Sequence, residues 1–245
     1  MTALPLSPAD RALLDAADRG DLDAVRAALT AGASVEARDA EGRTPLLRAA
    51  FADRVAVARL LVEAGADVNA QDAQLNSPWL VTGITGSVPM LRALLPGGPD
   101  LGLRNRYGGV SVIPAAERGH VAYVRAVLGE TAIDADHVND LGWTALLEAV
   151  LLGDGGPAHQ EIVGLLLAHG ADPRLPDADG VTARAHAERR GFHGIAEALR
   201  AAEAKTTAGT ETETEAEAGT GTGTGTGTED TTKRAEHGKG PGGAA

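Results

Sequence analysis

The chain has no cysteine, which excludes a disulfide framework, a Cys-based zinc site and a cysteine nucleophile. Aromatic residues are almost as scarce, with two Trp, two Tyr and two Phe in 245 residues, so small aliphatic side chains must do most of the packing. No stretch approaches the ~20 apolar residues of a membrane span, and the N-terminus lacks a basic segment followed by an apolar run. We therefore expect a cytoplasmic protein.

Acidic residues outnumber basic residues, and the formal net charge is −12. Residues 205–245 contain seven acids and four bases, which accounts for −3 and leaves −9 on the rest of the chain. A surface this acidic repels phosphates, so a nucleic-acid partner is not expected. No role for nucleic acid or membrane is predicted, and the chain is expected to act as a monomer. The abundance of Ala and Gly, with Lys only at 205, 233 and 239, suggests a GC-rich bacterial genome.

A repeated segment is the main feature that the sequence does contain. Related seven-residue stretches begin at Thr44, Ser77, Val110, Thr144 and Thr182, with spacings of 33, 33, 34 and 38, and Arg11 opens another one 33 residues before Thr44. Each is followed by a Gly-containing turn, a second apolar segment and a relative of Gly-Ala-Asp-Val-Asn, as at 65–69. A period of this length indicates a solenoid of stacked units.

Local chemistry predicts two short helices in each unit. The hydroxyls of Thr44, Ser77 and Thr144 can cap helix N-termini, and Gly32 and Gly65 stand where a second helix should end in a left-handed residue. Helices shorter than about 12 to 15 residues are marginal alone in water, so each must bury its Leu, Val and Ala face against neighbouring units.

These segments resemble ankyrin repeats, whose Gly-x-Thr-Pro-Leu-His-x-Ala-Ala and Gly-Ala-Asp-Val-Asn patterns they follow over roughly residues 8 to 202, and they are similar to those of a group of small bacterial ankyrin proteins. The resemblance implies an all-α repeat solenoid of six helix-turn-helix units joined by short β-hairpin loops. The predicted domain spans 1–203, with its first and last units as caps, and the Thr/Gly/Glu-rich residues 204–245 are predicted to be a disordered tail. The repeats are placed at 8–39, 40–72, 73–105, 106–139, 140–177 and 178–203.

The chain also departs from the family pattern. The His of Thr-Pro-Leu-His is replaced at every copy, by Leu47, Leu80, Ile113, Leu147 and Ala185. We therefore expect the registry of the repeats to depend more on packing. The fifth unit carries five extra residues, assigned to a loop within 153–160.

The resemblance implies that a partner binds at the hairpin tips and at the exposed end of each first helix. Tyr107 and Trp143 fall on adjacent predicted tips and are of the types enriched at binding hot spots, although Trp143 could instead pack flat on a neighbouring hairpin. We add Glu148, Asp154 and His159 because the inserted loop could border the same site. The full set of candidate partner-binding residues is Arg43, Phe51, Gln74, Asn76, Arg104, Arg106, Tyr107, Glu117, Arg118, Asp140, Trp143, Glu148, Leu151, Leu152, Asp154 and His159.

The alternatives are an enzyme or small-ligand binder with a pocket near the Gly153–His159 insertion, and a purely structural spacer. His137, Asp140, Asp154, His159 and Glu148 could supply acid and base groups there, but their spacing matches no catalytic motif. A metal site from His159 and His169 is disfavoured because ten residues separate them along one predicted helix. The sequence therefore predicts a noncatalytic protein-interaction module with no catalytic residue, metal or cofactor.

Overall fold

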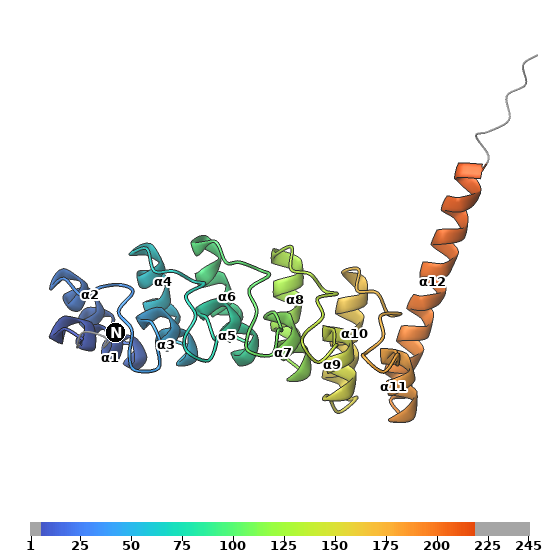
Figure 1. Cartoon of the computed structure of the whole chain (residues 1–245), viewed down its shortest axis with the longest axis horizontal. Helices are drawn as coiled ribbons and strands as arrows, with labels where there is room; N and C mark the ends of the chain where they lie inside the picture. The colour runs from blue at the N-terminus through green and yellow to red at the C-terminus, as the bar shows by residue number, and fades with distance from the viewer. Residues whose placement is uncertain (1–5, 219–245) are drawn as a thin grey trace, which may run out of the picture. The chain divides into compact units, whose positions relative to one another are not determined.

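The computed structural model describes residues 6–218, and the chain divides into two compact units, 1–206 and 207–245. Pairs of short helices follow one another along the first unit, as Figure 1 shows. Their bounds are α1 Pro8–Arg19, α2 Leu22–Thr30, α3 Pro45–Phe51, α4 Val55–Glu63, α5 Pro78–Thr85, α6 Val88–Leu94, α7 Val112–Glu117, α8 Val121–Glu130, α9 Ala145–Leu151, α10 Pro157–Ala168, α11 Ala183–Arg189 and α12 His193–Ala218, with a 3-10 turn, η1, at Leu95–Gly97.

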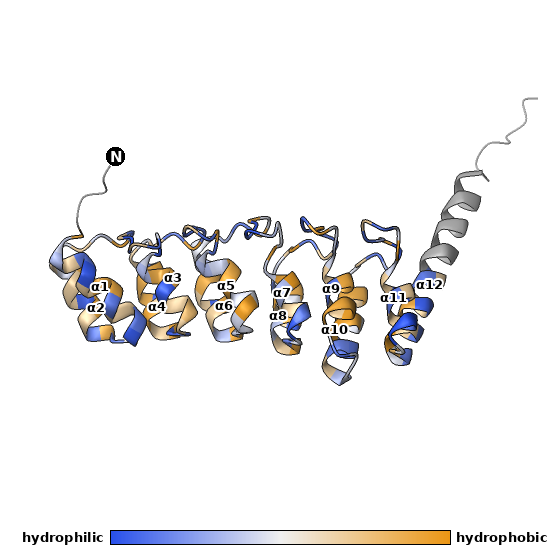
Figure 2. Cartoon of the chain, turned by 60° about the horizontal axis from the view of Figure 1, so that its bottom comes forward, coloured by the Kyte–Doolittle hydropathy of each residue, from blue (hydrophilic) through white to orange (hydrophobic). Residues whose placement is uncertain are grey.

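The pairs stack in chain order. The first helices α1, α3, α5, α7, α9 and α11 each contact the next in the row, and the second helices α2, α4, α6, α8 and α10 form a parallel row (Figure 1). The predicted all-α repeat stack of six helix pairs is thus confirmed. The connecting loops turn back like hairpins and lie along one side of the helix pairs (Figure 2), but within residues 6–218 they form no β-strand beyond one isolated bridge between Pro176 and Thr182.

Helix α12 crosses the predicted end of the repeat domain. It buries Ile195, Ala196 and Leu199 as the second helix of the last pair, and it then continues to Ala218. Residues 204–218 of the predicted tail are part of this helix, in keeping with the helix propensity of Ala and Glu next to a packed segment, and the disorder of the tail stays a prediction. The remainder of the predicted tail, 219–245, lies outside the described residues.

The predicted caps are present at most helices. Thr44, Ser77 and Thr144 accept hydrogen bonds from backbone N–H groups three residues later, at 3.1, 3.1 and 3.3 Å. Ser7 and Asp10 form a reciprocal capping box at the start of α1. Ser111 precedes α7 but does not cap it, because its own backbone is helical (φ −60°, ψ −28°).

Two rare aromatic side chains lie in the centre of the stack. Trp79 and Tyr123 are the largest fully buried side chains of the described residues, and the Tyr123 hydroxyl lies 2.7 Å from the Thr82 hydroxyl. Burial raises the pKa of Tyr123 to about 12. Beside them α5 and α7 approach so closely that a Cβ on Gly83 would lie 1.9 Å from the Ser111 carbonyl oxygen. Only glycine fits there.

The insertion of the fifth unit is mostly helix rather than loop. Helix α10 begins at Pro157 and has 12 residues, whereas the equivalent helices α4 and α8 have nine and ten. Pro157 suits this position because the first N–H of a helix has no intrahelical acceptor. The predicted 153–160 loop is therefore shorter than expected, and its last residues form the first turn of α10.

Candidate functional site

The hairpin tips are built on one recurring residue, an Asp or Asn. Its side-chain Oδ1 accepts hydrogen bonds from the backbone N–H groups two and four residues later, at 2.8–3.1 Å, and its own N–H donates to the carbonyl four residues later. A short acceptor side chain can close such a turn because it reaches its own backbone. The residues are Asp39, Asp72, Asn105, Asn139 and Asp177.

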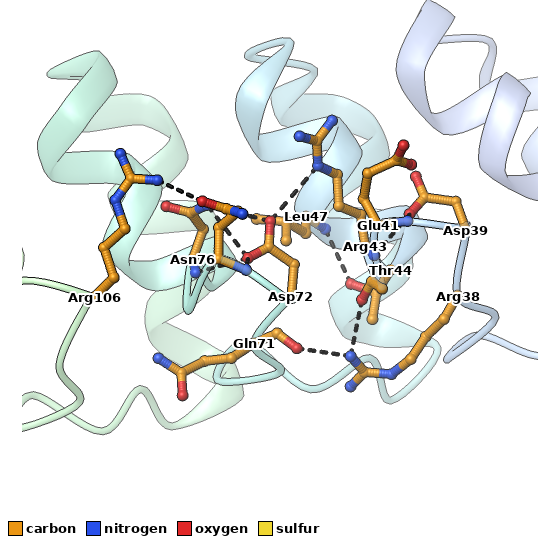
Figure 3. Close-up of polar contacts among 12 residues, drawn as sticks. Arg38, Asp39, Glu41, Arg43, Thr44, Leu47, Gln71, Asp72, Asn76 and Arg106 are labelled. Atoms are coloured by element: carbon orange, nitrogen blue, oxygen red, sulfur yellow. Dashed lines mark hydrogen bonds and ion pairs between the residues drawn. The ribbon is translucent and has the colours of Figure 1, made fainter. Parts of the chain in front are cut away.

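Side chains also connect one hairpin to the next (Figure 3). The Arg38 guanidinium donates to the carbonyl of Gly42 in its own hairpin, at 2.9 Å, and to that of Gln71 in the following one, at 2.7 Å. Gln71 repeats the arrangement, with its amide donating to Leu75 and, at 2.7 Å, to Arg104. These bonds hold the hairpins in register, and they act in addition to the packing on which we expect the registry of the repeats to depend.

A groove of about 480 Å³ lies between the hairpin tips and the C-terminal ends of first helices α3, α5, α7 and α9. Its apolar walls include Phe51 at the end of α3, Ile84 in α5 and Ile113 in α7, with Tyr107 and Leu141 from two tips. The groove is lined by Phe51, Asn76, Ile84, Asn105, Arg106, Tyr107, Gly109, Ile113, Pro114, Glu117, Arg118, Asn139, Leu141, Glu148 and Leu152.

Exposed apolar side chains gather in this groove. Within residues 6–205, whose side chains the structure describes, six large hydrophobic residues are exposed: Phe51, Leu75, Tyr107, Val138, Leu141 and Leu152. Four of the six, at 39% to 54% exposure, line the groove. Contiguous exposed apolar surface is costly for a soluble protein and marks an interaction site.

One carboxylate lies deep in the groove wall. Glu148 of α9 is only 6% exposed, and its Oε1 accepts a hydrogen bond from the Asn139 side-chain amide at 2.8 Å. Burial raises the pKa of Glu148 to about 7, with a further contribution from the negative charge of Glu117, while Asn139 and the Arg118 guanidinium act in the opposite direction. Glu148 therefore changes charge near neutral pH.

Two arginines line the groove, and both have partners. Arg118 donates to the Glu117 carboxylate at 2.8 Å and to the Pro114 carbonyl at 3.1 Å. The Arg106 guanidinium lies 4.8 Å from the centre of the Tyr107 ring and donates to Gln74.

Of the sixteen candidate residues, eight line this groove: Phe51, Asn76, Arg106, Tyr107, Glu117, Arg118, Glu148 and Leu152. Two more adjoin it, since Gln74 holds Arg106 and the Arg43 guanidinium lies 5.4 Å from the Phe51 ring centre. Arg104 and Asp140 are exposed on the tips but do not line it. Trp143 and Leu151 are half-buried and pack against the core.

The His159 and Asp154 side chains of the insertion form contacts outside the groove. His159 is 7% exposed, with one ring nitrogen 3.0 Å from the Glu117 carbonyl oxygen and the other 2.8 Å from the Asp154 carboxylate. This arrangement ties α10 to α7 and fixes the short loop, so neither His159 nor Asp154 lines the groove. Within the described part of the chain no three His, Asp or Glu side chains come together as a metal site.

Sequence reasoning missed seven groove residues, of which Asn105 and Asn139 are the most informative. Both occupy the recurring Asp or Asn position of the tips, and that recurrence, at the same 33- and 34-residue spacings as the helices, was a usable signal. The others, Ile84, Gly109, Ile113, Pro114 and Leu141, carry no local signal of exposure to a groove.

None of the helices in residues 6–218 is long and apolar enough to cross a membrane.

Comparison with known proteins agrees with the geometry. The family model described as ankyrin repeats (3 copies) matches residues 6–72 and 81–177, so this chain belongs to the ankyrin repeat family. It is 42% identical to the ankyrin repeat protein YahD of Escherichia coli (strain K12) over 197 residues, which are 80% of this chain and 97% of YahD.

Solved structures are similar over the same part of the chain. A crystallised ankyrin repeat domain from Acinetobacter baumannii AYE is 46% identical with a TM-score of 0.75, covering 78% of this chain and 96% of that one. The ankyrin repeat domain of Bcl-3, a member of the IkappaB protein family, is 29% identical with a TM-score of 0.70, covering 78% of this chain and 85% of that domain. Ankyrin repeats are in general protein-interaction modules.

Proposed function

We propose that this protein is a noncatalytic interaction module that binds another protein through the groove and the hairpin tips beside it. The observation that carries the proposal is the concentration of four of the six large exposed hydrophobic residues of the described chain in one cavity. Burying apolar surface is the main source of affinity between proteins, and the aromatic and Arg side chains at Phe51, Tyr107 and Arg106 are of the types that dominate it.

The proposal is tested with two matched variants, Leu152→Glu in the groove and Leu75→Glu outside it. The two leucines are similarly exposed, at 51% and 45%, so neither change removes a buried side chain. A buried Leu contributes about 1.5–3 kcal/mol, and Leu152→Glu also places a charge against the partner, so its affinity should fall by at least about tenfold.

The measurement begins with affinity capture from the native cell and mass spectrometry, and the captured protein is then purified for titration against each variant. Circular dichroism checks that both variants fold as the parent does. Weaker binding by Leu152→Glu alone locates the contact in the groove, and weaker binding by both extends it to the second hairpin tip. Unchanged binding by both variants refutes the proposal.

A further inference from the structure

Glu148 carries an acceptor that the protein itself does not use. Its Oε1 is bonded to Asn139, whereas Oε2 is bonded to no described residue and stays accessible in the groove. Neither arginine of the groove is bonded to it: Arg118 acts on it only through its charge and is bonded to Glu117, and Arg106 is bonded to Gln74. The groove therefore holds a nearly buried carboxylate without a bonded cation.

The preceding repeat leaves a donor unused. Asn105 is the equivalent of Asn139, but the position equivalent to Glu148 is Pro114, which has no acceptor side chain. The Asn105 Oδ1 closes its own hairpin turn, and no described residue accepts a hydrogen bond from its Nδ2. The groove thus offers an unused amide donor and an unused carboxylate acceptor, together with apolar walls.

Taking the proposed protein-binding groove as given, we infer that its occupant is an extended, basic segment of the partner whose Lys or Arg side chain binds the Glu148 Oε2. Apolar side chains flanking the basic residue pack on Phe51 and Leu152, and a carbonyl of the segment accepts a hydrogen bond from Asn105.

Three observations favour this occupant over others. The net charge of −9 on residues 1–204 attracts a basic partner. A volume of about 480 Å³ suits a few side chains. The free Asn105 amide requires a carbonyl that is not already paired, and an extended backbone offers such carbonyls whereas a helix has bonded them internally.

The titration of Glu148 supplies a specific readout. A cation bound at its carboxylate favours the ionised form, so binding near the pKa of about 7 releases a fraction of a proton. The charged groups around Glu148 are Glu117 and Arg118 at the end of α7, with His159 of α10 held on the Glu117 carbonyl. Arg190, directly after α11, donates to the carbonyls of Val150 and Leu151.

The experiment uses the full chain and a positional-scanning library of N-acetylated, C-amidated octapeptides. The best peptide is then titrated calorimetrically at pH 7 in buffers of different ionisation enthalpy, which measures the protons released. Glu148→Gln is the test variant, since its side-chain carbonyl can still accept the bond from Asn139. Glu63→Gln, at an exposed position at the end of α4, is the matched control.

We expect selection of Lys or Arg at one position with apolar neighbours, and release of a fraction of a proton. Glu148→Gln should bind the best peptide about tenfold or more weakly and release no proton, while Glu63→Gln behaves as the parent. Selection of acidic or uncharged peptides, or equal binding by Glu148→Gln, overturns the inference but leaves the groove as a binding site. Failure to select any peptide also overturns it, and the Leu152→Glu titration with the captured partner then decides separately whether the groove binds protein at all.

Discussion

Replacing Glu148 by Gln should change how the stability of the protein depends on pH. The folded state raises the pKa of Glu148 from 4.5 to about 7, chiefly by burial and then by the negative charge of Glu117. Between these two pH values the folded protein holds a proton that the unfolded chain has lost. The free energy of unfolding must therefore fall as the pH rises through this window, and the contribution that Glu148 makes below pH 4.5 is lost above pH 7.

The size of the effect follows from the same two values. One pKa unit corresponds to about 1.36 kcal/mol, so the rise from 4.5 to about 7 corresponds to about 3 kcal/mol. This is an upper value, because water in the groove solvates the accessible Oε2. A glutamine does not titrate, so the stability of Glu148→Gln relative to the parent should increase by up to that amount between pH 4.5 and pH 8.

The assay is urea-induced unfolding followed by circular dichroism at several pH values, for the parent, Glu148→Gln and Glu63→Gln. Titrations of all other groups are common to the three proteins and cancel in the differences. Glu148→Gln should gain stability over the parent as the pH rises, whereas Glu63→Gln should run parallel to the parent. A difference between Glu148→Gln and the parent that stays constant from pH 4.5 to pH 8 would refute the reasoning.

Two further pairs of substitutions test the packing, each measured by urea unfolding. Leu61, which is 0% exposed, should lose about 2–5 kcal/mol on change to Ala, and the half-buried Leu60 beside it should lose less; equal losses would contradict the assigned register. Gly83→Ala should destabilise strongly because its Cβ would lie 1.9 Å from the Ser111 carbonyl oxygen, whereas Gly129→Ala in α8 meets no atom within 4 Å and should stabilise by about 0.5–1 kcal/mol. A folded, unperturbed Gly83→Ala protein would show that α5 and α7 can move apart.

The repeat stack could be predicted from the sequence because its signals are local and occur many times. A hydroxyl cap at Thr44 or a left-handed glycine at Gly65 is weak evidence alone, but copies 33 or 34 residues apart support one another. The end of α12 could not be found in this way. The helix leaves the packed repeat with no capping signal, and its further course to Ala218 depends on helix propensity over a segment without a periodic apolar face.

The aromatic residues on the predicted tips show why the site was harder to predict than the fold. Tyr107 and Trp143 were equivalent candidates, yet Tyr107 is 54% exposed in the groove and Trp143 packs against the core. Sequence alone does not say on which side of a hairpin a side chain falls. In the same way, His159 and Asp154 had the chemistry of a site, but the contact of His159 with Glu117 across 42 residues, which fixes their role, comes from the tertiary structure.

One position recurs in every repeat, and the residue that occupies it differs in chemistry along the stack. It is the unspecified residue of Thr-Pro-Leu-His-x-Ala-Ala, occupied along the stack by Asp15, Arg48, Val81, Pro114, Glu148 and His186. Toward the ends of the row these residues pair with neighbours: Arg48 lies 3.6 Å from the Asp15 carboxylate, and His186 lies 2.6 Å from that of Asp177. In the middle, Val81 and Pro114 have no polar group to offer. The Asp72 carboxylate is held instead by Asn76 and Arg43, whereas no described residue accepts a hydrogen bond from the Asn105 amide. The groove therefore lies where the row stops supplying such pairs, and the proposed partner would satisfy the Asn105 amide that Pro114 leaves without an acceptor.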